Sequence, residues 1–332
     1  MTSSTSSSDP DSVARGRRWL AAFGVGFFGF GGALFALLLL IDPYDSGRFP
    51  NLGITGVDDR NPRTANVSRG RDPRFDAAIV ADSTGQLLQP TRLDAATGFR
   101  FVQLSTPQTG PREHLAEMHW VLSHHAGASA LVLVTDESWC SSDPRINLRY
   151  PFPFWLYGGD AQYLANVLNW KSLDRAVWRV QLALGRRHAV DPVGYSDYSA
   201  ESLHPFRALP PDPPPMTQAE AAEAFPWIEQ LARVLGRLSP DVAVVLVMPP
   251  VQASYLPAPD SPAALRFERC KQALARRVAG RPRSGFLDFR IDTPETRDQD
   301  NFFDRVHYKN PIAREIEDRI ATVLRPTSTA SR

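Results

Sequence analysis

The 332-residue sequence predicts an α/β protein with a three-layer, doubly wound parallel sheet of the flavodoxin-like kind, preceded by one transmembrane helix. Short, continuous apolar runs alternate with longer segments of helical period, which indicates parallel strands that are buried on both faces. Right-handed crossover connections then put helices on both sides of the sheet. One long uncharged run near the N-terminus predicts the membrane helix.

This uncharged run covers Trp19–Ile41 and reads WLAAFGVGFFGFGGALFALLLLI. At about 1.5 Å per residue, it is long enough to cross a hydrocarbon core of roughly 30 Å. A cleaved signal peptide and a buried core helix are the alternatives. The run favours neither, because no small-residue cleavage site follows it and it has no polar face.

Charges on the two sides of the run predict its orientation. Three arginines precede it, and Asp42 and Asp45 follow it. By the positive-inside rule, the N-terminus stays in the cytoplasm and everything after about residue 42 is exported. We therefore expect a single-pass protein of the cytoplasmic (inner) membrane, anchored through residues 19–41, with its globular domain on the periplasmic or extracytoplasmic side.

The rest of the chain divides by composition. Residues 1–18 are predicted to be a disordered cytoplasmic N-terminus, since they begin with a segment rich in Ser and Thr. Residues 42–70 lack an apolar period and predict an irregular linker that lifts the domain off the membrane. Residues 71–325 form the α/β domain, and residues 326–332 a disordered tail. The proline-dense segment 204–215 predicts a loop, either a lid over the site or a surface insertion.

Five buried strands and the helices between them make up the predicted sheet. The strands are expected at Phe75–Ala81, Phe99–Leu104, Ala130–Thr135, Val242–Met248 and Gly285–Phe289. The helices are expected at Arg112–His124, 160–169, 172–186, 217–237, 262–279 and Pro311–Leu324, with Asn310 as the N-cap of the last. In such folds functional groups gather in the loops at the C-terminal ends of the strands.

Charge and composition exclude several kinds of function. A formal net charge of +1 and the lack of a basic stripe argue against nucleic acid as a partner. No dinucleotide or P-loop glycine pattern is present, so no cofactor is expected. The two cysteines, Cys140 and Cys270, form no CxxC pattern and predict no metal site. They either pair in an oxidising compartment or stay as two buried, unpaired thiols. The unpaired interpretation is favoured, because free cysteines are usually buried.

Two strand ends carry candidate catalytic residues. The first predicted strand runs directly into Asp82-Ser83-Thr84-Gly85. A serine at a strand-to-helix turn has an exposed hydroxyl and lies beside free helical N–H groups that can stabilise an oxyanion. Ser83 is therefore a candidate nucleophile, although serine and threonine also cap helices without any catalytic role.

The second group of candidate catalytic residues precedes the last helix, in the sequence NFFDRVHY. Asp304 and His307 are three residues apart in this loop, so their side chains can lie on one face. The carboxylate then fixes the tautomer of the imidazole, whose other nitrogen acts as a general base. A surface aspartate with a solvated or capping histidine is the alternative.

With these residues in view, the chain resembles the SGNH/GDSL hydrolase superfamily, and more narrowly its membrane-anchored branch in the bacterial envelope. The Gly-Asp-Ser of that superfamily's first block is similar to Ala81-Asp82-Ser83, and its last-block Asp-x-x-His is similar to Asp304–His307. The resemblance covers roughly residues 75–324 and implies that Ser83, His307 and Asp304 form a triad. It further implies acyl-ester hydrolysis, or acyl transfer to and from a sugar hydroxyl, as polysaccharide O-acetyltransferases and esterases perform.

The chain departs from the family's pattern in two blocks. The glycine that donates to the oxyanion in the second block corresponds to either Gly110 or Gln108. The third block offers Asp136, with Trp139 nearby, where the family has an asparagine. An aspartate repels a developing negative charge unless it is protonated, and losing one donor typically costs roughly 10²–10³ in rate. A modified active site, a transferase and an inactive protein therefore all stay open.

Two functions follow from the sequence. The first is a membrane-anchored serine esterase or O-acyltransferase that acts on acylated envelope glycans or other acyl esters, with a membrane partner as a candidate acyl donor. The second is a catalytically inactive SGNH-like envelope protein that binds a glycan or a protein partner. Four aromatic residues either stack on sugar rings or belong to the core: Trp139, Trp155, Tyr157 and Trp170.

Overall fold

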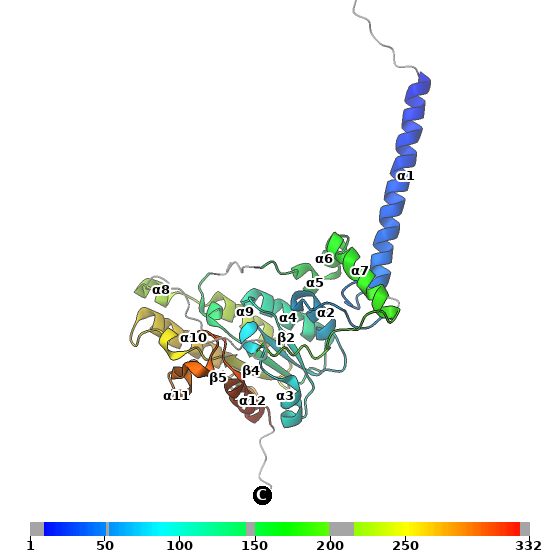
Figure 1. Ribbon diagram of the computed structural model, residues 1–332. Helices are drawn as coiled ribbons and strands as arrows, with labels where there is room; N and C mark the ends of the chain where they lie inside the picture. Colours follow the sequence, from blue (N-terminus) through cyan, green and yellow to red (C-terminus); the bar gives the residue numbers. More distant parts are fainter. Residues whose placement is uncertain (1–9, 51–52, 144–149, 199–215, 326–332) are drawn as a thin grey trace, which may run out of the picture.

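The computed structural model describes residues 10–50, 53–143, 150–198 and 216–325. Three predicted features therefore lie outside the described residues: the first part of the N-terminal segment, the proline-dense loop 204–215 and the tail 326–332. The described part consists of one long helix that projects from an α/β domain (Figure 1).

The domain is built on a sheet of five parallel strands in the order β2-β1-β3-β4-β5. The strands are β1 (Ala77–Ala81), β2 (Phe101–Ser105), β3 (Ala130–Val134), β4 (Ala243–Met248) and β5 (Gly285–Asp288). The prediction of a parallel α/β sheet is confirmed, and each predicted strand is present with slightly shifted ends. β1 lies beside β3, with Val80 in register with Leu133.

Helices cover both faces of the sheet (Figure 1). One face packs against α3 (Pro90–Thr97) and α12 (Asn310–Leu324). The other packs against α4 (Pro111–His124), α9 (Pro226–Leu235) and α10 (Pro262–Val278). Other elements are α5 (Phe154–Tyr157), α6 (Asp160–Asn166), α7 (Trp170–Ala183), α8 (Gln218–Ala222), α11 (Pro294–Arg297), and the 3-10 turns η1 (Ser83–Gly85), η2 (Glu137–Cys140), η3 (Ala253–Tyr255) and η4 (Gln299–Asn301).

The continuous apolar character of the strands follows from this layering. Successive residues of a strand point to opposite faces, and both faces are covered. Ile79 and Val132 pack in the core beside α12, whereas Val80 and Leu133 pack in the core beside α10. An alternating polar pattern would have left one face to water.

Two local predictions are wrong in detail, and one helix was not predicted. The single helix expected over 217–237 is broken into α8 and α9, because Pro226 lacks an N–H and starts a new helix at its first turn. The N-cap of α12 is Lys309, and Asn310 is already the first helical residue. Helix α3 was not expected at all. It starts at Pro90, a favourable residue for the first helical turn.

Helix α1 (Pro10–Ile41) contains a segment, Ala14–Ile41, that is long and apolar enough to cross a membrane. The helix extends back to residue 10, so the prediction of disorder over 1–18 is wrong for its second half. The prediction of an irregular 42–70 is wrong for α2 (Pro62–Gly70), which packs its Ala65 and Val67 into the domain. Asn61 caps this helix by accepting the Arg63 N–H at 3.1 Å.

The preferred interpretation of two unpaired thiols is also wrong. Cys140, at the end of η2, forms a disulfide with Cys270 in the middle of α10, with the two Cα atoms 5.5 Å apart. The pair is separated by 130 residues, and the crossover that carries α10 over the sheet brings them together. Cysteine spacing alone contains no information about such a long-range contact.

Candidate functional site

Ser83 is held in a tight turn immediately after β1. The Asp82 carboxylate accepts the Thr84 N–H at 2.8 Å and the Thr84 hydroxyl at 2.6 Å, which closes η1 around the serine. Gly85 completes the turn, because a Cβ at this position would lie 2.3 Å from the Cβ of Ala81. The Asp-Ser-Thr-Gly sequence therefore sets the direction of the Ser83 side chain at the carboxyl end of the sheet.

Asp304 and His307 lie in a second tight loop, between η4 and α12. Phe302 and Tyr308 form an isolated antiparallel bridge across this loop, and the Phe303 N–H donates to the His307 carbonyl at 2.8 Å. Inside the loop, Oδ1 of Asp304 accepts the His307 N–H at 2.9 Å. The closed loop brings the carboxylate and the imidazole of the Asp-x-x-His sequence together.

The two loops meet and connect the three candidate catalytic residues. Nε2 of His307 lies 2.9 Å from Oγ of Ser83, and Nδ1 of His307 lies 2.8 Å from Oδ2 of Asp304. With its proton on Nδ1, the imidazole donates to Asp304 and accepts the Ser83 hydroxyl at Nε2. The sequence separation of 224 residues between Ser83 and His307 is bridged by the fold. Geometrically, this is a serine triad.

The electrostatics of the triad favour a positioned base. Burial raises the pKa of the Asp304 carboxyl, but the hydrogen bond and charge of His307 and two backbone N–H groups outweigh it and bring that pKa down to about 2. Burial lowers the pKa of His307, and the hydrogen bond and charge of Asp304 outweigh it, so the pKa is raised. Asp304 is therefore ionised throughout the neutral range.

The triad is open to solvent. The side chain of His307 is 30% exposed and that of Asp304 is 23% exposed. Two hollows in the described part of the domain lie elsewhere, one lined by residues such as Phe75 and Leu131 and the other by Asp143 and Pro226. The partial exposure of His307 and Asp304 lets a ligand reach Ser83 from the surface at the carboxyl edge of the sheet.

A second acidic group, Asp136, lies close enough to Asp82 for their charges to interact. Asp136 follows β3, the neighbour of β1, and its Oδ1 accepts the Ser138 N–H at 3.1 Å. Burial and, next, the negative charge of Asp82 raise the pKa of Asp136, while Ser138 and Arg290 oppose the rise, and together they bring that pKa to about 7. Burial also raises the pKa of Asp82. Asp136 is thus a carboxyl group that exchanges its proton near neutral pH.

Arg290 and Tyr198 belong to this region and were missed by the sequence analysis. Arg290 is buried just beyond β5, and its charge lowers the pKa of both Asp82 and Asp136. Tyr198 packs its ring edge-on to the imidazole of His307, with the ring centroids 5.6 Å apart. The rule that function gathers at strand ends could have found Arg290, whereas Tyr198 lies in a segment without any pattern.

The expected oxyanion donors are mostly committed elsewhere. The Gly110 N–H donates to the Glu113 carboxylate at 3.2 Å, and Gln108 is exposed in a turn with a positive φ of 57°. In η1, the Thr84 N–H is bound by Asp82. Within the described residues, the Ser83 N–H donates to no protein acceptor and is left for a ligand.

The aromatic residues considered for sugar contact lie away from the triad. Trp139 is fully buried, and its ring stacks on that of His114 with the centroids 6.1 Å apart. Trp155 and Tyr157 pack in the cluster near the base of α1. Trp170 is exposed, but it lies on α7 beside α1. None of these four offers a stacking surface at Ser83.

Comparison with known protein families and with curated proteins identifies no relative. No model of a known protein family matches the chain, and no curated protein matches it. A functional assignment therefore depends on the geometry of the site.

Proposed function

We propose that the protein is a membrane-anchored serine esterase or O-acyltransferase that acts on acylated envelope glycans. One observation carries the proposal: the hydrogen-bonded chain from Ser83 Oγ through His307 to Asp304, with distances of 2.9 and 2.8 Å. A base within hydrogen-bonding reach of a serine, itself oriented by a carboxylate, is the arrangement that activates serine as a nucleophile.

The reaction proceeds in two halves. Oγ of Ser83 attacks the acyl carbonyl while Nε2 of His307 takes the hydroxyl proton, and the tetrahedral intermediate expels the alcohol, which receives that proton. The acyl group is then on Ser83. Water or a sugar hydroxyl attacks it, His307 takes the proton of the attacking group, and Ser83 recovers that proton as the acyl group leaves. Esterase and transferase thus differ only in the acceptor.

The negative charge of the tetrahedral intermediate needs donors. The Ser83 N–H supplies one. Asp136 supplies a second in its protonated form, since Ser138 engages Oδ1 and leaves Oδ2 to carry the proton. A protonated carboxyl donates as an asparagine amide would, whereas the ionised form repels the oxyanion. The raised pKa of Asp136, about 7, makes the protonated form available near neutral pH.

Two observations support a location outside the cytoplasm. Three arginines precede the apolar part of α1 and two aspartates follow it, which favours a cytoplasmic N-terminus. The disulfide between Cys140 and Cys270 is typical of an oxidising compartment. An exported domain held at the membrane would meet envelope polysaccharides, and their O-acyl groups are esters that a serine triad can cleave or transfer.

An inactive glycan-binding protein is the second candidate, and Asp136 is the observation that favours it. The resembled family has an asparagine at that position, and a permanently ionised aspartate would oppose the reaction. The direct contact of Ser83 with His307 supports the enzyme instead, because an inactive relative has no need to keep that hydrogen bond.

The test measures ester cleavage by the full-length chain in detergent micelles, with p-nitrophenyl acetate and with an O-acetylated polysaccharide. We expect turnover that falls by roughly 10³-fold or more in Ser83→Ala. Ser239→Ala is the matched control, because Ser239 is exposed at the opposite edge of the sheet, just before β4. Equal rates for the wild type and Ser83→Ala, together with polysaccharide binding by both, would support the inactive binding protein instead.

A further inference from the structure

The last turn of α1 is built into the domain. Leu38 and Ile41 are buried and pack against Leu173 and Ala176 of α7, while Leu40 on another side of the same turn stays half exposed. The C-terminal end of α1 therefore lies directly against α7. Figure 1 shows α7 crossing the base of α1.

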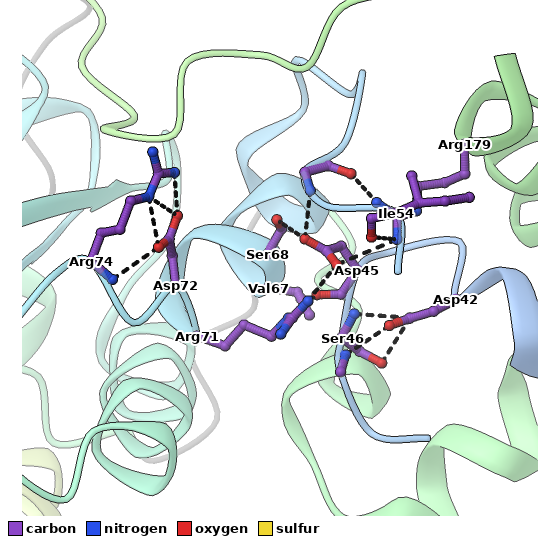
Figure 2. Close-up of polar contacts among 12 residues, drawn as sticks. Asp42, Asp45, Ser46, Ile54, Val67, Ser68, Arg71, Asp72, Arg74 and Arg179 are labelled. Carbon is purple, nitrogen blue, oxygen red and sulfur yellow. Dashed lines mark hydrogen bonds and ion pairs between the residues drawn. The ribbon is translucent and has the colours of Figure 1, made fainter. Parts of the chain in front are cut away.

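Buried carboxylates make this junction rigid (Figure 2). Asp42 accepts the Ser46 N–H at 2.8 Å and the Ser46 hydroxyl at 2.9 Å, which ends the helix in a closed turn. Asp45 accepts the Ser68 hydroxyl at 2.7 Å and forms ion pairs with Arg71 and Arg179. Because both carboxylates are buried and satisfied, the domain is held in one orientation relative to α1.

Helix α7 presents an apolar stripe to the outside. At about 100° per residue its members fall within roughly 80° of the helix circumference. The stripe consists of Trp170, Leu173, Val177 and Val180 of α7 and of Leu184, the C-cap residue that follows its last turn. Trp170 is 81% exposed, Leu184 61% and Val177 54%, whereas Leu173 contacts the end of α1. The stripe is thus continuous with the apolar surface of the anchor.

The other side of α7 fixes the direction of the stripe. Arg179 is buried and donates to the Ile54 carbonyl at 2.6 Å, and the Ser172 and Tyr44 hydroxyls are 3.1 Å apart. These contacts hold α7 against the segment that follows the anchor, so it cannot rotate to bury the stripe. Lys171 and Arg186 are exposed at its two ends, where anionic lipid headgroups would attract them.

We propose that α7 lies in the headgroup region of the membrane that α1 spans, with the stripe inserted among the lipids. An amphipathic helix with a tryptophan on its apolar face and cations at its edges is suited to that position. Its attachment to the membrane exit of α1 keeps it at the lipid surface. The proposal rests on α1 spanning the membrane and is independent of the proposed catalytic activity.

The test uses one fluorophore at a time on the full-length chain. Because Cys140 and Cys270 are bonded to each other, a cysteine introduced at Val177 is the only reactive thiol. Val177→Cys is labelled with a nitrobenzoxadiazole group and reconstituted into vesicles of phosphatidylcholine and phosphatidylglycerol. Leu265→Cys on α10 is the matched control, with a similar exposure of 47%. Leu184→Cys provides a second position on the stripe.

We expect a blue-shifted emission at Val177 and Leu184, and quenching by shallow doxyl-labelled lipids about twofold or more stronger than at Leu265. Equal quenching at all three positions would overturn the proposal. A blue shift at Val177 and Leu184 without lipid quenching would overturn it as well, since another protein surface would then cover the stripe. Because the proposal does not depend on catalysis, the esterase activity of the same samples does not bear on it.

Discussion

Asp304 contacts His307 twice: its Oδ2 lies 2.8 Å from the imidazole Nδ1, and its Oδ1 accepts the backbone N–H of the same histidine at 2.9 Å. The three-residue spacing makes both contacts local, so the imidazole is oriented by its own loop. Only the approach to Ser83 depends on the rest of the fold. A general base that is positioned before substrate arrives needs little reorganisation during the reaction.

Replacing Asp304 by asparagine should therefore impair catalysis with little effect on folding. The amide has the same shape, but it no longer holds the proton of His307 on Nδ1. Loss of this tautomer lowers kcat by roughly 10³–10⁴-fold in serine triads. Steady-state ester hydrolysis measures the effect, with thermal unfolding as the check on folding. Asp300→Asn, at an exposed position in η4 of the same region, should keep full activity.

The pH dependence should have two limbs. His307 must be neutral to accept the Ser83 proton, so kcat/KM rises with pH through the raised pKa of His307. Asp136 must be protonated to donate to the oxyanion, so kcat/KM falls as pH rises above about 7, the pKa of Asp136. The product of the two protonation states gives a bell-shaped profile whose maximum lies between the pKa values of His307 and Asp136.

Asp136→Asn separates the two limbs. The amide donates at every pH, so the variant should keep the acid limb and lose the alkaline one. The ratio of its kcat/KM to that of the wild type should grow by about tenfold for each pH unit above 7, until other groups titrate. Parallel profiles for the two proteins between about pH 6 and 8, where most domains are near their maximal stability, would show that Asp136 takes no part in the reaction.

Gly85 should tolerate no side chain. A Cβ there would meet the Ala81 Cβ at 2.3 Å and a Val134 methyl at 3.2 Å, so the turn that holds Ser83 would have to shift. Gly85→Ala should lower the free energy of unfolding by about 1–3 kcal/mol and reduce ester hydrolysis severely. Gly127→Ala is the control, since nothing lies within 4 Å of an added Cβ there. Equal activity of the two variants would contradict this account of the turn.

The disulfide should contribute strongly to stability. It links η2 at the end of β3 to α10 and closes a segment of 130 residues, so its loss should cost about 2–5 kcal/mol of unfolding free energy. Thermal unfolding of wild type with and without dithiothreitol measures this. The Cys140→Ala/Cys270→Ala variant should unfold at the lower temperature and ignore the reductant. Two alkylatable thiols in the untreated, folded protein would contradict the pairing.

The features that could be predicted from the sequence are those set by local patterns. Strands covered on both faces must be continuously apolar, as the Ala77–Ala81 run is, and strand ends are where side chains such as Ser83 become available. The contact between Asp304 and His307 could also be predicted, because both residues belong to one loop.

The features that were missed depend on contacts between distant segments. The Cys140–Cys270 pairing and the position of Tyr198 against His307 follow from how crossovers pack, which no local pattern encodes. Residues 42–70 lack an apolar period and were therefore predicted to be an irregular linker that lifts the domain off the membrane. Buried ion pairs such as that of Asp45 with Arg179 hold it to the domain instead.

The central claim is that Ser83 is an activated nucleophile, and mass spectrometry after treatment with a fluorophosphonate tests it most directly. We expect a single phosphonyl adduct on the full-length protein, mapped to the peptide that contains Ser83. The adduct should be absent from Ser83→Ala and strongly reduced in His307→Ala, while Ser239→Ala labels like the wild type. An unmodified wild-type protein with an intact thermal transition would contradict the claim, as would an adduct on any other residue.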